Sequence, residues 1–316
     1  MSNFTDGKFE FQSAKTVYWS GVVEGRGYID RAEKIIIPAQ LYMPKNISEK
    51  IPAMVIVHGI GGLYTRDGKK RAYWEYAELL AENGIAAVIV DTHGARGVGV
   101  STMLGSAEVP VYSFAADAFA VADLLRTHPQ IDSDRIGIMG FSKGGSTSLL
   151  ASDQRFTSLS KTKSAFKLHI PIYPGCQTFP AVLQPTRAQV HMLLGSEDNF
   201  TGISGCFEIE QKLKESNTPT KITVYKGAHH GWDENVSLIR SYDVSSEDCR
   251  WILHDSGVVS GKNRQPILNS SDGNTYFKNC TKQSTIWIGR NESANKSGRQ
   301  AVIDTVKQYL VDPVKP

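Results

Sequence analysis

Short apolar segments alternate with stretches of helical periodicity through most of this 316-residue chain. Residues 53–57 and 85–90 are continuous apolar runs rich in β-branched side chains, and residues 71–82 between them carry apolar side chains at helical spacing. A strand that is buried on both faces has this continuous apolar character, and strands that alternate with helices form a parallel sheet covered on both faces. The sequence therefore predicts an α/β fold with a mostly parallel central sheet flanked by helices. Further strands are expected at 35–37, 41–43, 135–140, 168–172, 190–194 and 222–225, and further helices at 114–126, 144–151, 206–215 and 301–310.

One segment breaks this alternation. Residues 233–296 are polar, rich in Asn, Ser and Gly, and without a strong period, and their apolar anchors at 251–253 and 286–288 are short. Because loops rarely exceed ~15 residues, we expect an ordered but irregular insertion here, before the last helix. Single hydrophobic cores grow to ~250–300 residues, so residues 1–316 are expected to form one domain that contains this insertion.

The composition argues against several classes of protein. The net charge is only +3 and no block of Lys or Arg stands out, which argues against a nucleic-acid partner. No apolar run reaches the ~18 residues that are needed to span a bilayer. The four cysteines form no C-x-x-C pair, which argues against a structural zinc site. The sequence leaves the oligomeric state open.

Residues 140–144, Gly-Phe-Ser-Lys-Gly, fit the pattern G-x-S-x-G. The pattern follows an expected strand and opens an expected helix, which is the context of a nucleophile elbow. Side chains two positions on either side of Ser142 would collide with this sharp turn, so glycines are needed there. The N-terminus of the helix also offers N–H groups that favour developing negative charge. The alternative is a plain strand–turn–helix with a capping serine, but the context favours Ser142 as a nucleophile.

A serine hydroxyl needs a base to take its proton, and chains with this elbow carry the serine, the acid and the histidine in that order. Two later strands end in suitable residues, with Gly-Ser-Glu-Asp at 195–198 and Gly-Ala-His-His-Gly at 227–231. The carboxyl ends of parallel strands are where such sites assemble. Asp198 is the predicted acid, with Glu197 as the fallback. His229 and His230 are both candidates for the base.

The segment 57–62, Val-His-Gly-Ile-Gly-Gly, ends the first central strand. In sheets with this elbow, that loop and the residue after the nucleophile supply the two N–H donors of an oxyanion hole. We therefore expect the backbone amides of Ile60 and Lys143 to be the donors. A phosphate-binding glycine loop is the alternative, but no lysine follows at Walker spacing and the pattern G-x-G-x-x-G is absent.

By these motifs the chain resembles the dienelactone hydrolase family. The matching stretches extend over most of the chain up to about residue 233, at 55–62, 91–97, 135–145, 195–198 and 227–232. In similar sequences the histidine directly before the final glycine–aromatic pair is catalytic, which selects His230. The resemblance implies an α/β-hydrolase fold that acts on small esters or lactones and holds no metal or cofactor. The namesake enzymes carry a cysteine nucleophile where this chain has Ser142, which favours a general esterase over an enzyme specific for dienelactone.

The expected activity is that of a serine hydrolase that cleaves carboxylic esters or lactones through an acyl-enzyme intermediate. Peptidases and acyltransferases of the same fold share the G-x-S-x-G pattern and are alternatives. A non-catalytic binding protein on a hydrolase scaffold is an alternative of another class, and the complete Ser/Asp/His set argues against it.

Arg96 lies in a loop after the strand that ends near Asp91. Members of the family with acidic substrates hold a carboxylate with arginines, and a guanidinium fork suits that task. The resemblance thus makes Arg96 a candidate substrate-binding residue. The alternative is a structural arginine that pairs with Asp91 or Asp117.

The positions of the four cysteines favour two disulfides. In a fold of this kind the loops that carry Cys176 and Cys206 are neighbours at one end of the sheet, and Cys249 and Cys280 both lie inside the polar insertion. The predicted pairs are therefore Cys176–Cys206 and Cys249–Cys280. Because disulfides persist in oxidising compartments, a periplasmic or secreted location is favoured over the cytoplasm.

Overall fold

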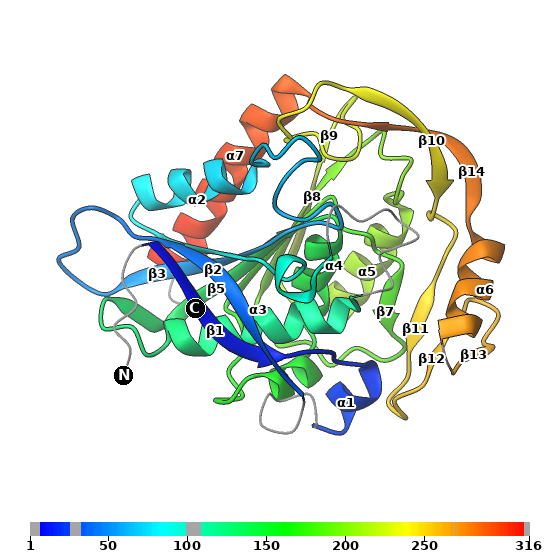
Figure 1. Cartoon of the computed structure of the whole chain (residues 1–316), viewed down its shortest axis with the longest axis horizontal. Coiled ribbons are helices and arrows are strands. Elements are labelled where there is room, and N and C mark those ends of the chain that lie inside the picture. The colour runs from blue at the N-terminus through cyan, green and yellow to red at the C-terminus, as the bar shows by residue number, and fades with distance from the viewer. Residues whose placement is uncertain (1–6, 26–32, 99–108, 269, 313–316) are drawn as a thin grey trace.

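A computed structural model describes residues 7–25, 33–98, 109–268 and 270–312 (Figure 1). Its centre is an eight-stranded sheet with the order β1-β2-β4-β3-β5-β6-β8-β9. Strand β2 pairs antiparallel with β1 and with β4, and the pairs from β4 to β9 are parallel. The predicted α/β-hydrolase fold with a mostly parallel sheet is confirmed. The strands are β1 (Gly7–Ala14), β2 (Lys34–Tyr42), β3 (Ile51–Val57), β4 (Ala86–Val90), β5 (Ile131–Phe141), β6 (Leu168–Ile172), β8 (Gln189–Gly195) and β9 (Thr220–Tyr225).

Helices cover both faces of this sheet. The side chains of β3 alternate between the faces: Met54 and Ile56 belong to the core under α2 and α7, whereas Val55 and Val57 belong to the core under α3. Both faces of β3 are therefore buried, which explains its continuous apolar sequence. In the described part of the chain, no helix has the length and apolar character needed to cross a membrane. The helices outside the insertion are α1 (Trp19–Val23), α2 (Tyr73–Glu82), α3 (Val111–Leu125), α4 (Lys143–Leu150), α5 (Ser204–Glu215) and α7 (Glu292–Val306).

The segment 233–296 was expected to be irregular, but it contains regular elements (Figure 1). Strands β10 (Ile239–Ser245) and β14 (Lys282–Ile288) form an antiparallel two-stranded ribbon. Three short strands join β7 (Thr178–Pro180) in a second small sheet, and α6 (Ser270–Cys280) packs beside them. These strands are β11 (Trp251–Leu253), β12 (Val259–Ser260) and β13 (Pro266–Ile267). The last residues of the segment, from Glu292 onward, already belong to α7.

An aromatic cluster and a disulfide help to hold this polar segment together. The Trp251 ring lies 5.5 Å from the Tyr276 ring and 6.0 Å from the Phe277 ring, measured between centroids. A disulfide joins Cys249 to Cys280. Backbone pairing within the ribbon needs no apolar period, since much of the ribbon is exposed to solvent, and for this reason the sequence showed no strand there. A second disulfide, Cys176–Cys206, lies in the main body of the protein.

Candidate active site

Ser142 sits in the sharp turn between β5 and α4 with φ 53° and ψ −114°, a conformation that non-glycine residues rarely adopt. A side chain on Gly140 would overlap the backbone of Gly144, and one on Gly144 would overlap the carbonyl oxygen of Val57. The strand, the turn and the start of the helix therefore approach so closely that only glycine fits at both positions. The Ser142 amide donates to the carbonyl oxygen of Ile172 at 2.9 Å, which fixes the turn against β6.

The structure brings His230 and Asp198 to this serine from two other loops. Nε2 of His230 lies 2.9 Å from Oγ of Ser142, and Nδ1 of His230 lies 2.7 Å from Oδ2 of Asp198. Ser142, Asp198 and His230 are 8%, 6% and 5% exposed. The three residues thus form one continuous, buried hydrogen-bonded row across the carboxyl ends of β5, β8 and β9.

The Asp198 carboxylate is held by its own loop. Oδ1 accepts the amides of Phe200 and Thr201 at 3.0 and 3.1 Å, and Oδ2 accepts the Thr201 hydroxyl at 3.1 Å. Burial alone would raise the pKa of Asp198, but the charge of His230 and these hydrogen bonds outweigh it and lower the pKa below its ordinary value. The ionised carboxylate accepts the Nδ1 proton of His230, which leaves the lone pair of Nε2 directed at the serine hydroxyl.

The neighbouring acid and histidine point elsewhere. Glu197 is exposed, and its carboxylate accepts the hydroxyl of Ser196 at 2.9 Å. The His229 ring turns away from the row, with Nδ1 at 3.0 Å from the carbonyl oxygen of Glu197 and the ring beside Trp287. Of the two candidate acids and two candidate bases, Asp198 and His230 are therefore the ones that lie at Ser142.

The glycine loop at 59–63 lies directly against the serine. A Cβ on Gly59 would stand 3.3 Å from Cβ of Ser142, and the Gly59 amide donates to the Tyr73 hydroxyl at 3.1 Å. Ile60 follows in this loop, and Lys143 is the first residue of α4. The side chain of Lys143 points away, with Nζ donating to the carbonyl oxygen of Val109 at 2.6 Å. The charged end of Lys143 is therefore not directed at Ser142, and the predicted roles of Ile60 and Lys143 concern their backbone amides.

Two aromatic residues that sequence reasoning missed enclose the histidine. The Tyr173 and Phe200 rings lie 4.9 and 5.0 Å from the His230 ring, both edge-on. Tyr173 has φ 35°, and its hydroxyl donates to Oδ1 of Asp233 at 2.6 Å. The available signal was its position directly after β6, because the carboxyl ends of parallel strands gather at one edge. These rings restrict how the imidazole can tilt.

Two further histidines are buried near the glycine loop. The His58 ring stacks edge-on against the His93 ring at 4.8 Å, and its Nε2 accepts the His93 amide at 3.4 Å. Burial lowers the pKa of His58 to about 4 and that of His93 to about 2. Both rings are consequently neutral at pH 7.

Arg96, expected as a candidate substrate-binding residue, has a structural role instead. Its guanidinium is 8% exposed and pairs with the fully buried Asp117, with nitrogen–oxygen distances of 2.8 and 3.1 Å. Its other N–H groups donate to the backbone carbonyl oxygens of Ala14, Lys15 and Thr92 at 2.8 to 2.9 Å. With its donors engaged by the protein, Arg96 fastens β1 to α3, which supports the structural role that was the alternative to substrate binding. Asp117, and not Asp91, is its acidic partner.

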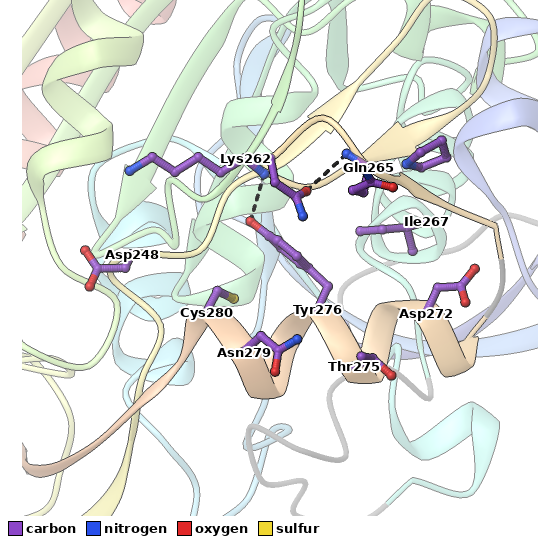
Figure 2. A pocket seen from close by; sticks show the side chains of 11 residues that line it. Asp248, Lys262, Gln265, Ile267, Asp272, Thr275, Tyr276, Asn279 and Cys280 are labelled. Atoms are coloured by element: carbon purple, nitrogen blue, oxygen red, sulfur yellow. Dashed lines mark hydrogen bonds between the residues drawn. The ribbon is translucent and has the colours of Figure 1, made fainter.

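A cavity of about 580 Å³ lies away from this row of residues, between α6 and the turn before β13 (Figure 2). The Tyr276 hydroxyl reaches across it and accepts the Lys262 amide at 3.0 Å. The cavity belongs to the insertion and includes neither Ser142 nor His230 in its lining. Within the described ranges, no group of three or more His, Cys, Asp or Glu side chains is placed to hold a metal ion.

Comparisons with known proteins agree with this architecture. Residues 37–253 match the model of the dienelactone hydrolase family. The human protein arylacetamide deacetylase-like 2 is 29% identical over 171 residues, which are 51% of this chain but only 39% of that protein. A Bradyrhizobium sp. protein described as a 2-oxo-3-(5-oxofuran-2-ylidene)propanoate lactonase is 23% identical over 203 residues, 60% of this chain and 76% of that protein.

Two solved structures share the fold over 96% of this chain. A Klebsiella pneumoniae protein described as a dienelactone hydrolase has a TM-score of 0.56, 16% identity and coverage of 100% of its own chain. A dienelactone hydrolase-like promiscuous phosphotriesterase from metagenomic libraries has a TM-score of 0.58, 14% identity and coverage of 99%. At these identities the likeness shows the fold alone. The match to the family model, which spans more than two thirds of the sequence, is the finding that identifies this chain as a member of the dienelactone hydrolase family.

Proposed function

We propose that this chain is a serine hydrolase that cleaves carboxylic esters or lactones through an acyl-enzyme intermediate. The observation that carries the proposal is the unbroken row of hydrogen bonds from Asp198 through His230 to Ser142. An imidazole that is fixed by a carboxylate and directed at a serine in a strained turn is the arrangement that turns a hydroxyl into a nucleophile.

In the proposed reaction Oγ of Ser142 attacks the acyl carbon and its proton passes to Nε2 of His230. The charge that develops on the acyl oxygen is stabilised by the amides of Ile60 and Lys143, each worth ~10²–10³ in rate in comparable sites. The tetrahedral intermediate collapses as the carbon–oxygen bond to the alcohol breaks, and the leaving oxygen takes the proton from Nε2. Water then attacks the acyl-enzyme with His230 again as the base. Asp198 stays ionised throughout and stabilises the imidazolium.

A covalent trap provides the direct test. An activated aryl phosphonate should attach one label to each molecule of the wild-type protein, and peptide mapping should place the label on Ser142. An activated aryl ester should release a burst of phenol equal in amount to the enzyme if deacylation is the slower step. A Ser142→Ala protein should take up no label. Ester turnover by Ser142→Ala at the wild-type rate would contradict the proposed mechanism.

We also propose that the protein works in an oxidising compartment, outside the cytoplasm. The support is the pair of disulfides, both with Cα atoms 5.0 to 5.1 Å apart. Among the described residues there is no free cysteine. Mapping of thiols in protein isolated from its native source, with alkylation before lysis, tests this proposal. Four alkylated cysteines would contradict it.

A further inference from the structure

A buried ion pair joins two loops of the candidate site. Nη1 of Arg71 lies 3.1 Å from Oε1 of Glu234, and the two side chains are 17% and 9% exposed. Arg71 lies two residues before α2, whereas Glu234 follows His230 by four residues. The two partners are 163 positions apart in the sequence, so the contact is purely tertiary.

On one side, Arg71 is packed onto the loop that carries Ile60. A Cβ on Gly61 would lie 2.6 Å from Nη2 and 3.0 Å from Cζ of Arg71, so the guanidinium covers the backbone of Gly61. The Arg71 amide also donates to the carbonyl oxygen of Leu63 at 3.2 Å. The guanidinium and the backbone amide of Arg71 therefore both contact the loop at 59–63.

On the other side, Glu234 is folded over the residue next to the base. Its amide donates to the carbonyl oxygen of Gly231 at 3.0 Å, and its Cγ lies 3.3 Å from where a Cβ on Gly231 would stand. Gly231 directly follows His230. Glu234 therefore contacts the residue next to His230, and Arg71 contacts the glycine loop, so the ion pair connects the two parts of the site.

We propose that Arg71 and Glu234 are positioning residues that hold the amide of Ile60 in place relative to His230, and that they do so only while Glu234 is ionised. This inference rests on the proposed function, because it concerns the donor and the base of that reaction. The transition state needs both groups at once, and misplacement of a catalytic group by about 1 Å can cost ~10²-fold. The pair should therefore affect the chemical step more than substrate binding.

The ionisation of Glu234 falls in the neutral range. Burial raises the pKa of Glu234 to about 7, with Asp233 adding to the rise and Arg71 and His230 opposing it. Oε2 of Glu234 has no hydrogen-bond partner in the described structure, and Oε1 accepts a hydrogen bond from Arg71. Ionisation of Glu234 therefore strengthens mainly its contact with Arg71. Above about pH 7 the pair is charged on both sides; as the pH falls through 7 the carboxylate is protonated and the attraction is lost. The charged and titratable groups that face Glu234 are Arg71, Tyr73, Tyr173, His230 and Asp233.

The primary test is Glu234→Gln, which keeps the shape of the side chain and removes its charge. We expect kcat to fall by roughly 10- to 100-fold with KM changed less than about twofold, because the loss is in the transition state. Protonation of His230 lowers kcat in both proteins, so the informative quantity is the ratio of wild-type to Glu234→Gln kcat. This ratio should be largest above about pH 7 and fall toward one as the pH drops below 7, because protonated Glu234 is uncharged like Gln. A ratio near one at high pH, or a ratio that does not change with pH, would overturn the proposal.

A second variant and a matched control separate positioning from general stability. Arg71→Met should lower kcat about as much as Glu234→Gln, and the double variant should be no worse than either single variant, because the two residues act as one contact. The control is Asp123→Asn, which removes an ion pair at the end of α3. Asp123 lies 3.1 Å from Arg126, and the two side chains are 13% and 8% exposed, similar to the Arg71–Glu234 pair. Asp123→Asn should lower stability while keeping kcat. Equal losses of kcat in the control, or additive losses in the double variant, would refute the positioning role.

Folding and the proposed function are checked in the same experiment. Each variant should take up the phosphonate label at Ser142, which shows that the site is formed. If Glu234→Gln is unaffected while Ser142→Ala is inactive, the further inference fails and the proposed function stands. If Ser142→Ala is active, the proposed function fails with it. Should Glu234→Gln not fold, Arg71→Lys retains the charge but not the planar fork over Gly61, and a kcat equal to that of wild type would then refute the inference.

Discussion

Removal of the Cys249–Cys280 disulfide is the perturbation that tests how the insertion supports the site. The cross-link closes a loop of 31 residues. In the chain-entropy model, a cross-link that closes a loop of this length lowers the conformational entropy of the open segment by ~12 cal/mol/K. This loss disfavours opening by ~3.7 kcal/mol at 25 °C. Opening of the segment should therefore become roughly several hundred-fold more frequent in a Cys249→Ser/Cys280→Ser protein.

The ribbon transmits this loosening to the candidate site. The Gly289 amide, just beyond β14, donates to the carbonyl oxygen of His230 at 3.0 Å. Asn199, directly after Asp198, donates through Nδ2 to the carbonyl oxygen of Thr285 at 2.8 Å. An open ribbon thus releases contacts on both the base and the acid side, and we expect larger acyl groups to be affected more than acetyl groups.

Hydrogen exchange and ester hydrolysis form the assay. In the double-serine variant, amides of β10 and β14 should exchange faster while those of β3 and β5 stay protected. Hydrolysis of a long-chain ester should fall relative to that of an acetyl ester. The control is Cys176→Ser/Cys206→Ser, which opens a loop of almost equal length, 30 residues, in the main body of the protein. It should cost similar global stability without selective exchange in the ribbon.

Two results would refute this reasoning. One is a double-serine variant in which β10 and β14 exchange no faster than in the wild type. The other is an unchanged ratio of long-chain to acetyl ester hydrolysis in a variant whose ribbon demonstrably exchanges faster. The second result would show that the insertion is held by the disulfide but does not shape the substrate site.

The remaining predictions concern the residues at the serine, each measured as kcat on a soluble aryl ester with circular dichroism as the check on folding. Ser142→Ala should lose at least ~10³ in kcat and keep its fold; a folded variant with near-normal turnover would exclude the mechanism. His230→Ala should abolish activity and His229→Ala should retain much of it, because the His229 ring points to a backbone carbonyl; the reverse outcome would reassign the base. Asp198→Asn should reduce kcat by up to ~10⁴ through the wrong histidine tautomer, and Glu197→Gln should have a mild effect; a severe loss in Glu197→Gln with normal Asp198→Asn would reassign the acid.

Most of the central sheet could be predicted from the sequence because its strands are buried on both faces. β3 and β4 are continuous apolar runs for that reason. β1 was missed, since it lies at the edge of the sheet and its buried residues, such as Phe11, are few. The ribbon β10–β14 was missed because its strands are stabilised by backbone pairing with large exposed faces. An apolar sequence pattern indicates burial, and β1, β10 and β14 bury few of their side chains.

The row of residues at the serine was predictable because the fold requires them at the ends of particular strands, in a known order along the chain. Residue type and spacing could not identify the groups that hold this row in place. Tyr173 contacts His230 only because β6 lies between β5 and β8, and Arg71 meets Glu234 only when two distant loops fold together. The sequence context of Arg96 likewise allowed two roles, and the ion pair with the buried Asp117 favours the structural one.

The backbone contact between Gly289 and His230 also joins the histidine to a residue that is added later during synthesis. Chains grow from the N-terminus at ~5–20 residues per second, so the partner of His230 is added roughly 3 to 12 seconds after the histidine itself. During most of that interval the nascent chain already contains Ser142, Asp198 and His230 but lacks β14, which pairs with β10 and accepts a hydrogen bond from Asn199. The residues proposed for the chemistry are thus made before β14, so a chain that ends before residue 282 carries every proposed reactive side chain without the strand that contacts Asn199 and leads to Gly289.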